Sequence, residues 1–404
     1  MSVLYITHDG VTDHIGRSQV APYLLGLAGK GFQLRVVSAE KAGRDELVGR
    51  YQKLFDEAGI SWIRRHYRNT PQFVGQAATL LELRRAARAI VRSQGVRVVH
   101  CRSFIPGIVG YEFKRTLGTK FIFDFRDFVA DGGLVKSRGA RKLISAGLKK
   151  IEGPMIREAD KIVCLTHKAS ELLSSWYLRD DPRPDRRFQI VPCCADFSHF
   201  DRGRLSAADI ESARAKLGVR GKPILLYLGS LGPDYLLAEM IALFLQLLKA
   251  RPNSQFLFLC NNGKELVEAE CAAGNIPPGQ VLFRSADRDE VPSLIALADM
   301  SVIFIRADVS KAGCSPTKLA ELFACGVPVI ANSGVGDMDS IIALERNGSV
   351  IVRDFSDASL SGAINQILAF NDSKRINIRE NSREFALEEG VARYATVYSE
   401  LLAG

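Results

Sequence analysis

Several features are missing from this chain, and each absence narrows its possible function. Its 404 residues contain no apolar run near the ~18 residues that a membrane-spanning helix needs. The first residues, Met1 to Thr7, lack a basic stretch and a long apolar segment, so we expect a first β-strand there and not a signal peptide. The eight cysteines are scattered, and no two pairs have zinc-ligand spacing, which argues against a metal site. Several lie in or beside strand-like runs, as buried thiols do in a reducing compartment, so we expect a cytoplasmic protein.

Size and composition point to a globular protein of two domains. The apolar fraction is 47% and the charged fraction 25%, both ordinary for globular proteins. A chain of 404 residues exceeds one common domain, so two domains with separate cores are expected.

The formal net charge of +9 favours anionic partners. One predicted helix combines a basic face with apolar positions; its members are Lys136, Arg138, Arg141, Lys142, Lys149 and Lys150, with Leu143, Ile144, Leu148 and Ile151. Two interpretations remain open: docking on an anionic membrane surface, which would make the protein peripheral on the inner face of the cell membrane, or an ordinary solvated helix. Aromatic residues are not interleaved with this basic stretch as a base-stacking platform requires, so we expect no nucleic acid partner.

Short apolar runs alternate with helical patterns along the whole chain. In the first half the runs are Val3–Thr7, Leu34–Ser38, Val96–Cys101, Lys120–Phe125 and Lys161–Leu165, and helical patterns include Val20–Lys30 and Leu80–Arg92. The second series comprises Ile224–Leu228, Phe256–Leu259, Val281–Phe283, Ser301–Ile305, Val327–Ala331 and Ser349–Val352. This alternation predicts the α/β class, with two Rossmann-like, doubly wound parallel sheets joined near residue 200.

Glycine-rich loops follow the first strand of each half. They contain Gly10 and Gly16 in the first half and Gly229 and Ser230 in the second. In doubly wound sheets a ligand binds beyond the carboxyl ends of the strands, so these loops predict a ligand shared between two domains. The alternative is that each glycine only permits a tight strand-to-helix turn.

The segment Ser315-Pro316-Thr317-Lys318-Leu319-Ala320-Glu321 is the most informative stretch of the chain. Ser315 can cap a helix, Pro316 suits its first turn, and Cys325-Gly326 can end it. The start of such a helix offers backbone N–H groups, a hydroxyl and an ammonium to a phosphate. Glu321 lies one turn further along, on the face of Lys318, where it can accept hydrogen bonds from a sugar hydroxyl. The segment therefore predicts a nucleoside diphosphate at the helix start, with its ribose held by a carboxylate.

These segments together resemble a family 4 glycosyltransferase of the two-domain GT-B fold, in particular a bacterial branch of capsule and exopolysaccharide clusters. The residues that carry the resemblance are Asp9-Gly10, Gly16-Arg17-Ser18-Gln19-Val20, Phe121 to Asp127, Gly229-Ser230-Leu231-Gly232, Ser315 to Glu321 and Asn332 to Asp337, with Val191-Pro192, Asp196 and Phe200 before the linker. The resemblance implies an acceptor-side domain over residues 1–200 and a nucleotide-sugar-binding domain over 201–389. A C-terminal helix over 390–404 would pack back on the first domain.

The same resemblance implies a retaining transferase that moves a sugar from a nucleotide-diphosphate sugar to a glycan or lipid-linked acceptor in surface polysaccharide synthesis. Glu321 matches the carboxylate that holds the ribose, and Ser315, Pro316 and Thr317 match the loop at the diphosphate and sugar. The donor base would be read near Arg284.

The chain departs from the family pattern in three places. Gly313 stands where the family has a second glutamate, and Ser230 and Tyr235 stand where it has an arginine and a lysine that stabilise the leaving diphosphate. Since departure of the diphosphate builds negative charge, we hypothesise that Arg306, Lys311 and Lys318 replace the missing cations.

On the acceptor side, the strand ending at Asp124 places Arg126 and Asp127 just beyond it. Asp124 or Asp127 could bind sugar hydroxyls and Arg126 a phosphate, although an Asp–Arg pair that stabilises a loop fits equally well. Arg102, Asp13 and Arg17 are further acceptor-side candidates.

The paired residues Asp337 and Asp339 open a helix, where acidic residues favour the positive end of the dipole. We therefore expect a reaction without metal or other cofactor, in which Lys and Arg neutralise the charge.

Other functions remain as alternatives. A sugar-nucleotide epimerase would need facing acid and base carboxylates, and Glu321 has no obvious partner. A catalytically inactive sugar-nucleotide-binding protein rests only on the missing family residues.

Overall fold

The structure is a computed structural model that describes residues 2–131, 138–219, 222–373 and 377–403. The chain divides into two compact units. Unit 1 comprises Met1–Cys193, Ala312–Cys314 and Leu387–Gly404, and unit 2 comprises Cys194–Lys311 and Ser315–Ala386. No described helix is long and apolar enough to span a membrane.

Unit 1 is built on a seven-stranded parallel sheet in the order β3-β2-β1-β4-β5-β6-β7. Its strands are β1 (Ser2–Thr7), β2 (Gln33–Glu40), β3 (Ser61–His66), β4 (Val96–Arg102), β5 (Lys120–Asp124), β6 (Lys161–Cys164) and β7 (Phe188–Ile190). Its helices are α1 (His14–Gln19), α2 (Ala21–Gly29), α3 (Asp45–Glu57), α4 (Gln72–Ser93), α5 (Phe104–Leu117), α6 (Arg138–Glu158), α7 (His167–Tyr177) and α17 (Leu387–Ala403).

Unit 2 is built on a six-stranded parallel sheet in the order β10-β9-β8-β11-β12-β13. Its strands are β8 (Ile224–Leu228), β9 (Gln255–Leu259), β10 (Val281–Arg284), β11 (Met300–Ile303), β12 (Val329–Asn332) and β13 (Val350–Val352). Its helices are α8 (Ala207–Leu217), α9 (Leu237–Ala250), α10 (Lys264–Ala273), α11 (Val291–Ile295), α12 (Thr317–Ala324), α13 (Met338–Ile341), α14 (Leu344–Asn347), α15 (Asp357–Ser373) and α16 (Ile378–Asn381).

Each sheet is covered on both faces, which explains why its central strands are apolar throughout. In unit 1 the buried core joins strand residues such as Ile6, Val99 and Phe123 to residues of α4, α5 and α6. In unit 2 the core joins Tyr227, Phe258 and Val302 to residues of α9 and α15. Burial of such side chains is the main favourable contribution to folding. The predicted fold class is therefore confirmed, with a separate core in each unit.

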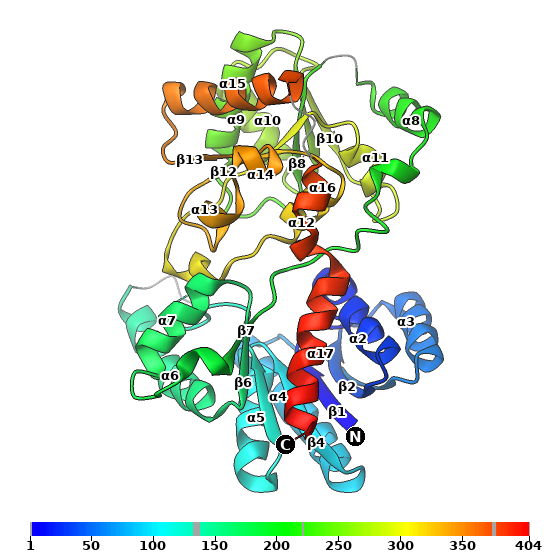
Figure 1. The fold of residues 1–404 in the computed structure, drawn as a ribbon, viewed down its shortest axis with the longest axis vertical. Helices are drawn as coiled ribbons and strands as arrows, with labels where there is room; N and C mark the ends of the chain where they lie inside the picture. The colour runs from blue at the N-terminus through cyan, green and yellow to red at the C-terminus, as the bar shows by residue number, and fades with distance from the viewer. Residues whose placement is uncertain (1, 132–137, 220–221, 374–376, 404) are drawn as a thin grey trace. The chain divides into compact units, whose positions relative to one another are not determined.

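The C-terminal helix α17 belongs to unit 1 although it comes last in the sequence. It packs on α2 and β4, and Figure 1 shows it in red along the blue and cyan strands of that unit. Its buried side chains include Tyr394 and Tyr398, which reach the polar ends of the central strands. The last segment of the chain thus completes the first unit.

Candidate functional site

In unit 1, polar side chains gather at the carboxyl ends of β4 and β5. Arg102 ends β4, Asp124 ends β5, and the two are paired in the register of the parallel sheet. The β1 residue Thr7 lies opposite Arg102 on the other side. The sheet therefore brings together Arg102, Asp124 and the loop after β1, as the sequence predicted for strand ends at one edge.

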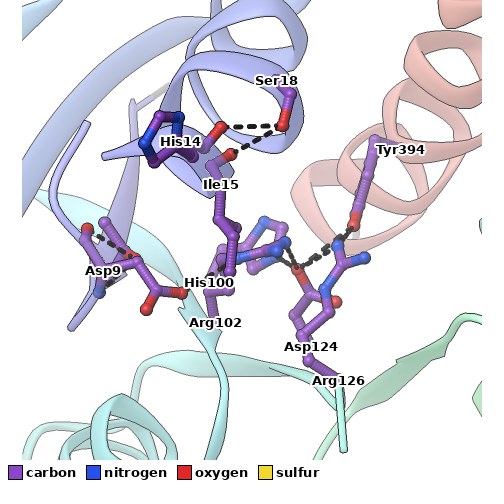
Figure 2. A network of polar contacts seen from close by, with 10 residues as sticks. Asp9, His14, Ile15, Ser18, His100, Arg102, Asp124, Arg126 and Tyr394 are labelled. Carbon is purple, nitrogen blue, oxygen red and sulfur yellow. Dashed lines mark hydrogen bonds and ion pairs between the residues drawn. The ribbon is translucent and has the colours of Figure 1, made fainter. Parts of the chain in front are cut away.

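The Asp124 carboxylate is fully buried and accepts three hydrogen bonds on one oxygen. His100 Nε2 lies 3.2 Å from Oδ2, Arg126 Nη2 donates to it at 2.7 Å, and the Tyr394 hydroxyl donates at 3.1 Å. Arg126 also donates to the Tyr394 hydroxyl. Figure 2 shows Arg126 and Tyr394 converging on Asp124 from a loop and from α17.

Electrostatics fix the protonation states of this network. Burial alone would raise the pKa of Asp124, but Arg126 and the hydrogen bond from His100 outweigh it and hold that pKa well below its usual range. Burial lowers the pKa of His100, so its imidazole is neutral near pH 7. A neutral imidazole can donate from Nε2 to Asp124 and accept at Nδ1 from Tyr398, whose hydroxyl lies 2.7 Å away. Asp124 and His100 are thus internal groups that orient Arg126.

The glycine-rich loop after β1 is held by Glu40 and by close backbone contacts. The Glu40 carboxylate accepts from the Val11 N–H at 2.7 Å and from the Thr12 hydroxyl at 2.6 Å. A Cβ added at Gly10 would lie 2.8 Å from Glu40 Oε2, and one at Gly16 would lie 2.0 Å from the Gly10 carbonyl oxygen. Both glycines are therefore required by the path of this loop, whatever binds beside it.

The remaining acceptor-side candidates of unit 1 are spread over the same edge. Asp13 is paired with Lys41 at 3.0 Å and with Arg44. Arg17 Nη2 lies 3.0 Å from His14 Nδ1. Asp127 is exposed, one residue beyond Arg126. The sheet edge thus brings Arg102, Asp124 and Arg126 together, while Asp13 already has two cationic partners.

In unit 2, the segment Ser315 to Glu321 leads into and begins helix α12. The helix begins at Thr317 with Pro316 at its N-cap, so the expectation that Ser315 would be the capping residue is wrong. Its C-terminus follows the prediction, since Gly326 adopts φ +73° directly after Cys325. The first-turn N–H groups of α12 lie at the helix start, where the dipole favours an anion.

Lys318 is buried, and its ammonium lies against two tyrosine rings. The nitrogen is 4.2 Å from the ring centre of Tyr227 and 4.3 Å from that of Tyr235. It also lies under Gly229, where an added Cβ would sit 3.2 Å from Lys318 Nζ. Gly229 follows β8 with φ +105°, a conformation that favours glycine. Lys318 therefore places a desolvated cation directly beside the glycine loop of unit 2.

Glu321 lies one turn beyond Lys318 and is mostly buried. Burial raises its pKa to about 7, although Arg288 and Lys318 both act to lower it. At pH 7 this carboxyl group therefore exchanges readily between its protonated and ionised forms. Such a group can accept hydrogen bonds from a diol once it is ionised.

The other donor-side candidates lie around the same strand ends. Lys311 Nζ is paired with Asp234 at 2.7 Å, and the backbone N–H of Arg306 donates to the Asp234 carbonyl, while the Arg306 side chain is exposed. Arg284 Nη2 lies 3.5 Å from Glu290 Oε1. The Ser230 carbonyl accepts from the Tyr227 hydroxyl at 2.9 Å. Lys311 and Arg306 thus meet at the loop that carries Asp234 and Tyr235.

The departure at Gly313 has a local physical reason. Gly313 lies in unit 1, where a Cβ at this position would approach the Phe128 ring to 3.3 Å. A larger side chain would require the aromatic ring to move. The glutamate that the family pattern places here would therefore disturb the packing of Phe128.

The described residues contain no group of three or more His, Cys, Asp or Glu side chains that could hold a metal ion. The Asp339 carboxylate accepts from the Gly334 N–H at 2.9 Å, and Asp337 is the N-cap residue of α13. Asp339 therefore holds the loop before α13, and Asp337 stands at the start of that helix. No described part of the chain supplies a recognisable metal centre.

Several site residues escaped the sequence analysis. Tyr394 lies 270 residues from Asp124 and Tyr398 lies 298 residues from His100, so no local pattern links them. Tyr227 lies inside an apolar strand and reads as core. Arg288 is one of many surface cations in the sequence, and only the fold places its charge near Glu321. Residues that act from distant segments were thus the ones missed.

The basic helix proposed for membrane docking is α6, but not all of its cations are available to lipid. Lys149 pairs with Asp131 at 2.7 Å and lies 4.7 Å from the ring centre of Trp176. Lys136 lies outside the described residues. Lys149 therefore joins α6 to α7.

Comparison with known proteins links both units to one class of enzyme. The model "Glycosyl transferase 4-like domain" matches residues 17–192, and the model "Glycosyl transferases group 1" matches residues 209–385. No curated protein sequence gives a significant match.

Solved structures share the complete fold at low sequence identity. A sucrose-phosphate synthase from Thermosynechococcus elongatus is 18% identical with a TM-score of 0.74, over 100% of this chain and 99% of that one. HepE of Anabaena, in complex with UDP-glucose, is 15% identical with a TM-score of 0.67, over 99% and 100%. WaaG, a glycosyltransferase involved in lipopolysaccharide biosynthesis, is 15% identical with a TM-score of 0.65, over 98% and 99%. With a glycosyltransferase model matching each unit of this GT-B fold, the chain belongs to the glycosyltransferases of the family 4 type.

Proposed function

We propose that this protein is a retaining glycosyltransferase that takes a sugar from a nucleotide-diphosphate sugar. The observation that carries the proposal is the arrangement at the start of α12, where the buried Lys318 ammonium lies beside Gly229 and Glu321 follows one turn later. A cation next to a helix start binds a diphosphate, and a carboxylate one turn away binds the ribose hydroxyls. The UDP-glucose complex of HepE, a protein of the same fold, is consistent with such a donor.

Lys318 is the residue best placed to replace the missing family cations. Its ammonium touches the ring of Tyr235, which stands at the position of the family lysine. The charge is therefore supplied from α12 instead of from the loop after β8. As the diphosphate leaves, this fixed cation gains more from the growing negative charge than it does from the intact donor, which lowers the barrier.

Lys311 and Arg306 have a supporting role in this proposal. The charge of Lys311 is neutralised in part by Asp234, which lies in the same loop as Tyr235. The backbone N–H of Arg306 donates to the Asp234 carbonyl and so holds Arg306 to this loop as well. An ion pair of this kind can open when a stronger anion arrives. We therefore assign the main charge stabilisation to Lys318 and a weaker share to Lys311 and Arg306, without a metal ion.

The acceptor is proposed to be a glycan or a lipid-linked sugar of bacterial surface polysaccharide synthesis, bound at the β4 and β5 ends of unit 1. The role of WaaG in lipopolysaccharide biosynthesis supports this class of acceptor for the fold. A lipid-linked acceptor would also give a purpose to a peripheral position on the membrane, which flotation with vesicles of anionic lipid tests. Failure to float would remove the membrane from the proposal and leave the transfer reaction untouched.

The transfer reaction is tested with a panel of nucleotide sugars, with and without lipid-linked acceptors, by measuring the free nucleotide released and the sugar product. A product that keeps the anomeric configuration of the donor is expected. An isomerised donor would instead show an epimerase, which needs a second carboxylate facing Glu321. Binding of nucleoside diphosphate without release or isomerisation across the panel would show a catalytically inactive binding protein.

A further inference from the structure

Unsatisfied hydrogen-bond donors concentrate at the carboxyl edge of the unit 1 sheet. Among the described residues there, Arg102 Nε and Nη1, Arg126 Nε and Arg17 Nε are buried nitrogen atoms without a hydrogen-bond partner. In the Asp124 network, by comparison, a single acceptor oxygen, Asp124 Oδ1, is buried without a hydrogen-bond partner. Buried polar atoms are nearly always paired in folded proteins, so such a cluster points to a partner that belongs to the working protein.

Arg102 is the centre of this cluster. Only 5% of its side chain is exposed. Its nearest carboxylates are too far away for hydrogen bonds, since Asp9 Oδ2 lies 3.7 Å from Nε and Asp124 Oδ2 lies 3.9 Å from Nη1. The guanidinium is therefore held near two negative charges while two of its donors remain unused. Figure 2 shows Arg102 between Asp9 and Asp124.

Buried positive charge also exceeds buried negative charge around Asp124. Arg102 and Arg126 both lie beside the one buried carboxylate, Asp124, and each guanidinium repels the other. Asp124 accepts a hydrogen bond from Arg126, at 2.7 Å, and none from Arg102. Asp9, the second anion, is 34% exposed and thus partly screened by water. An additional anion at Arg102 would balance the buried charge.

The chemistry of the missing partner follows from this excess of donors. An arginine has five N–H donors and no acceptor, so its partner must supply acceptors. Hydroxyl groups of a neutral sugar bring donors as well as acceptors. A phosphate or carboxylate brings acceptors alone and matches the fork of a guanidinium in a bidentate contact.

We propose that the acceptor substrate carries an anionic group, a phosphate ester or a carboxylate, that binds Arg102 with help from Arg126. The anion enters from the Asp9 side, where the edge of the network reaches solvent, and Asp9 turns away from Arg102 as it binds. That the anion belongs to the acceptor substrate rests on the proposed transferase function, whereas binding of an anion at Arg102 does not. Arg102 is then a residue that selects charged acceptors over neutral ones.

The test uses the full-length protein and methyl phosphate as the probe, with methyl α-glucoside as the neutral comparison, by calorimetric titration at constant ionic strength. Wild type is expected to bind methyl phosphate, and Arg102→Gln to raise its Kd at least tenfold. Arg102→Lys, which keeps the charge and loses the fork, is expected to fall in between. The matched control is Arg97→Gln, an exposed arginine on the same strand, which should change the Kd less than twofold.

Two further measurements keep the result decisive. Lys318→Ala is titrated in parallel: if this variant loses methyl phosphate binding and Arg102→Gln keeps it, the anion occupies unit 2 and the inference is wrong. Equal binding of the neutral glucoside, or no binding of methyl phosphate by folded wild type, also overturns it. If Arg102→Gln does not fold, the Arg102→Lys titration decides. Nucleoside diphosphate titrations run in parallel, so that a failed donor site and a failed anion site are told apart.

Discussion

At the scale of single residues, Lys318 carries the chemical part of the proposal. Replacing it by alanine removes the buried cation from the start of α12, and we expect kcat to fall by about 10²- to 10³-fold, as for loss of one preorganised charge-stabilising donor. The assay is release of nucleotide from the active donor. Lys249→Ala, an exposed lysine of the same unit paired with Asp357, serves as the control and should be silent. Unchanged turnover in Lys318→Ala would contradict the replacement of the family cations.

The variant Gly229→Ala tests whether the close packing of this backbone against Lys318 contributes to stability. Alanine here must adopt φ +105° and brings its Cβ to 3.2 Å from the lysine nitrogen, so we expect a loss of about 1–3 kcal/mol in the free energy of unfolding. Urea denaturation measures it. The control is Gly232→Ala in the same loop, where an added Cβ meets no atom within 4 Å. Equal stability of the two variants would show that the backbone at Gly229 relaxes freely.

Glu321 should make donor binding depend on pH. Because burial raises the pKa of Glu321 to about 7, the carboxylate that accepts ribose hydrogen bonds forms only as the pH rises through that value. We expect nucleoside diphosphate to bind more tightly at pH 8 than at pH 6, by severalfold, and Glu321→Gln to flatten this dependence. Calorimetric titration at several pH values measures it, and a wild-type profile as flat as that of the variant would contradict it.

The same shift has a consequence for stability without ligand. A carboxyl group whose pKa is raised in the folded state favours folding while it is protonated in both states, below its unfolded pKa near 4.5. That contribution is lost as the pH rises through about 7, when the folded protein must hold the buried charge. Glu321→Gln should therefore weaken the decline of stability between pH 5 and 8, roughly in proportion to the shift.

At the scale of elements, the attachment of α17 depends on two tyrosine hydroxyls. Tyr398→Phe leaves His100 Nδ1 buried without a donor, which we expect to cost about 1–3 kcal/mol of folding free energy. Chemical denaturation measures the loss. Tyr111→Phe, whose hydroxyl accepts from Arg115 on the surface, is the control and should cost far less. If both variants cost the same, the Tyr398 hydroxyl contributes little to the docking of α17.

The elements themselves were largely visible in the sequence. Every predicted strand is present, with ends that differ by one or two residues, because strands covered on both faces are apolar throughout. β3 and β7 were not predicted. Ser61–His66 has only two apolar residues, Trp62 and Ile63, followed by two arginines, so it lacks the apolar run of a central strand, and Phe188–Ile190 has only three residues. The helix predicted to open at Asp337 and Asp339 is short: α13 ends at Ile341, and a separate helix, α14, begins at Leu344.

The site was less predictable than the fold. The convergence of Arg102 and Asp124 follows from the rule that parallel strands end at one edge, and the pattern at Ser315 to Glu321 marked α12 correctly. The tyrosines around Lys318, and those of α17 around Asp124, could not be predicted because their partners are set by tertiary packing. The burial that raises the pKa of Glu321 is likewise a property of the folded unit.

At the scale of the whole molecule, the proposal makes the reaction independent of metal ions. Lys318, Lys311 and Arg306 supply positive charge around the strand ends of unit 2, and the described residues offer no metal-binding cluster. We therefore expect turnover to change less than twofold in an excess of chelator. Nucleotide release measured before and after adding the chelator checks this expectation. Activity that disappears and returns on adding Mg²⁺ or Mn²⁺ would contradict it.

The position of α17 also has a consequence for how the polypeptide is made. As the ribosome releases the N-terminal sheet, Asp124 and His100 emerge without Tyr394 and Tyr398, which are synthesised some 270 to 298 residues later. The N-terminal unit therefore begins to fold first and is finished last. A message that stops early within unit 2 would yield a nascent chain whose first half still has buried polar groups without these hydroxyl partners, which marks it for recognition by chaperones and proteases.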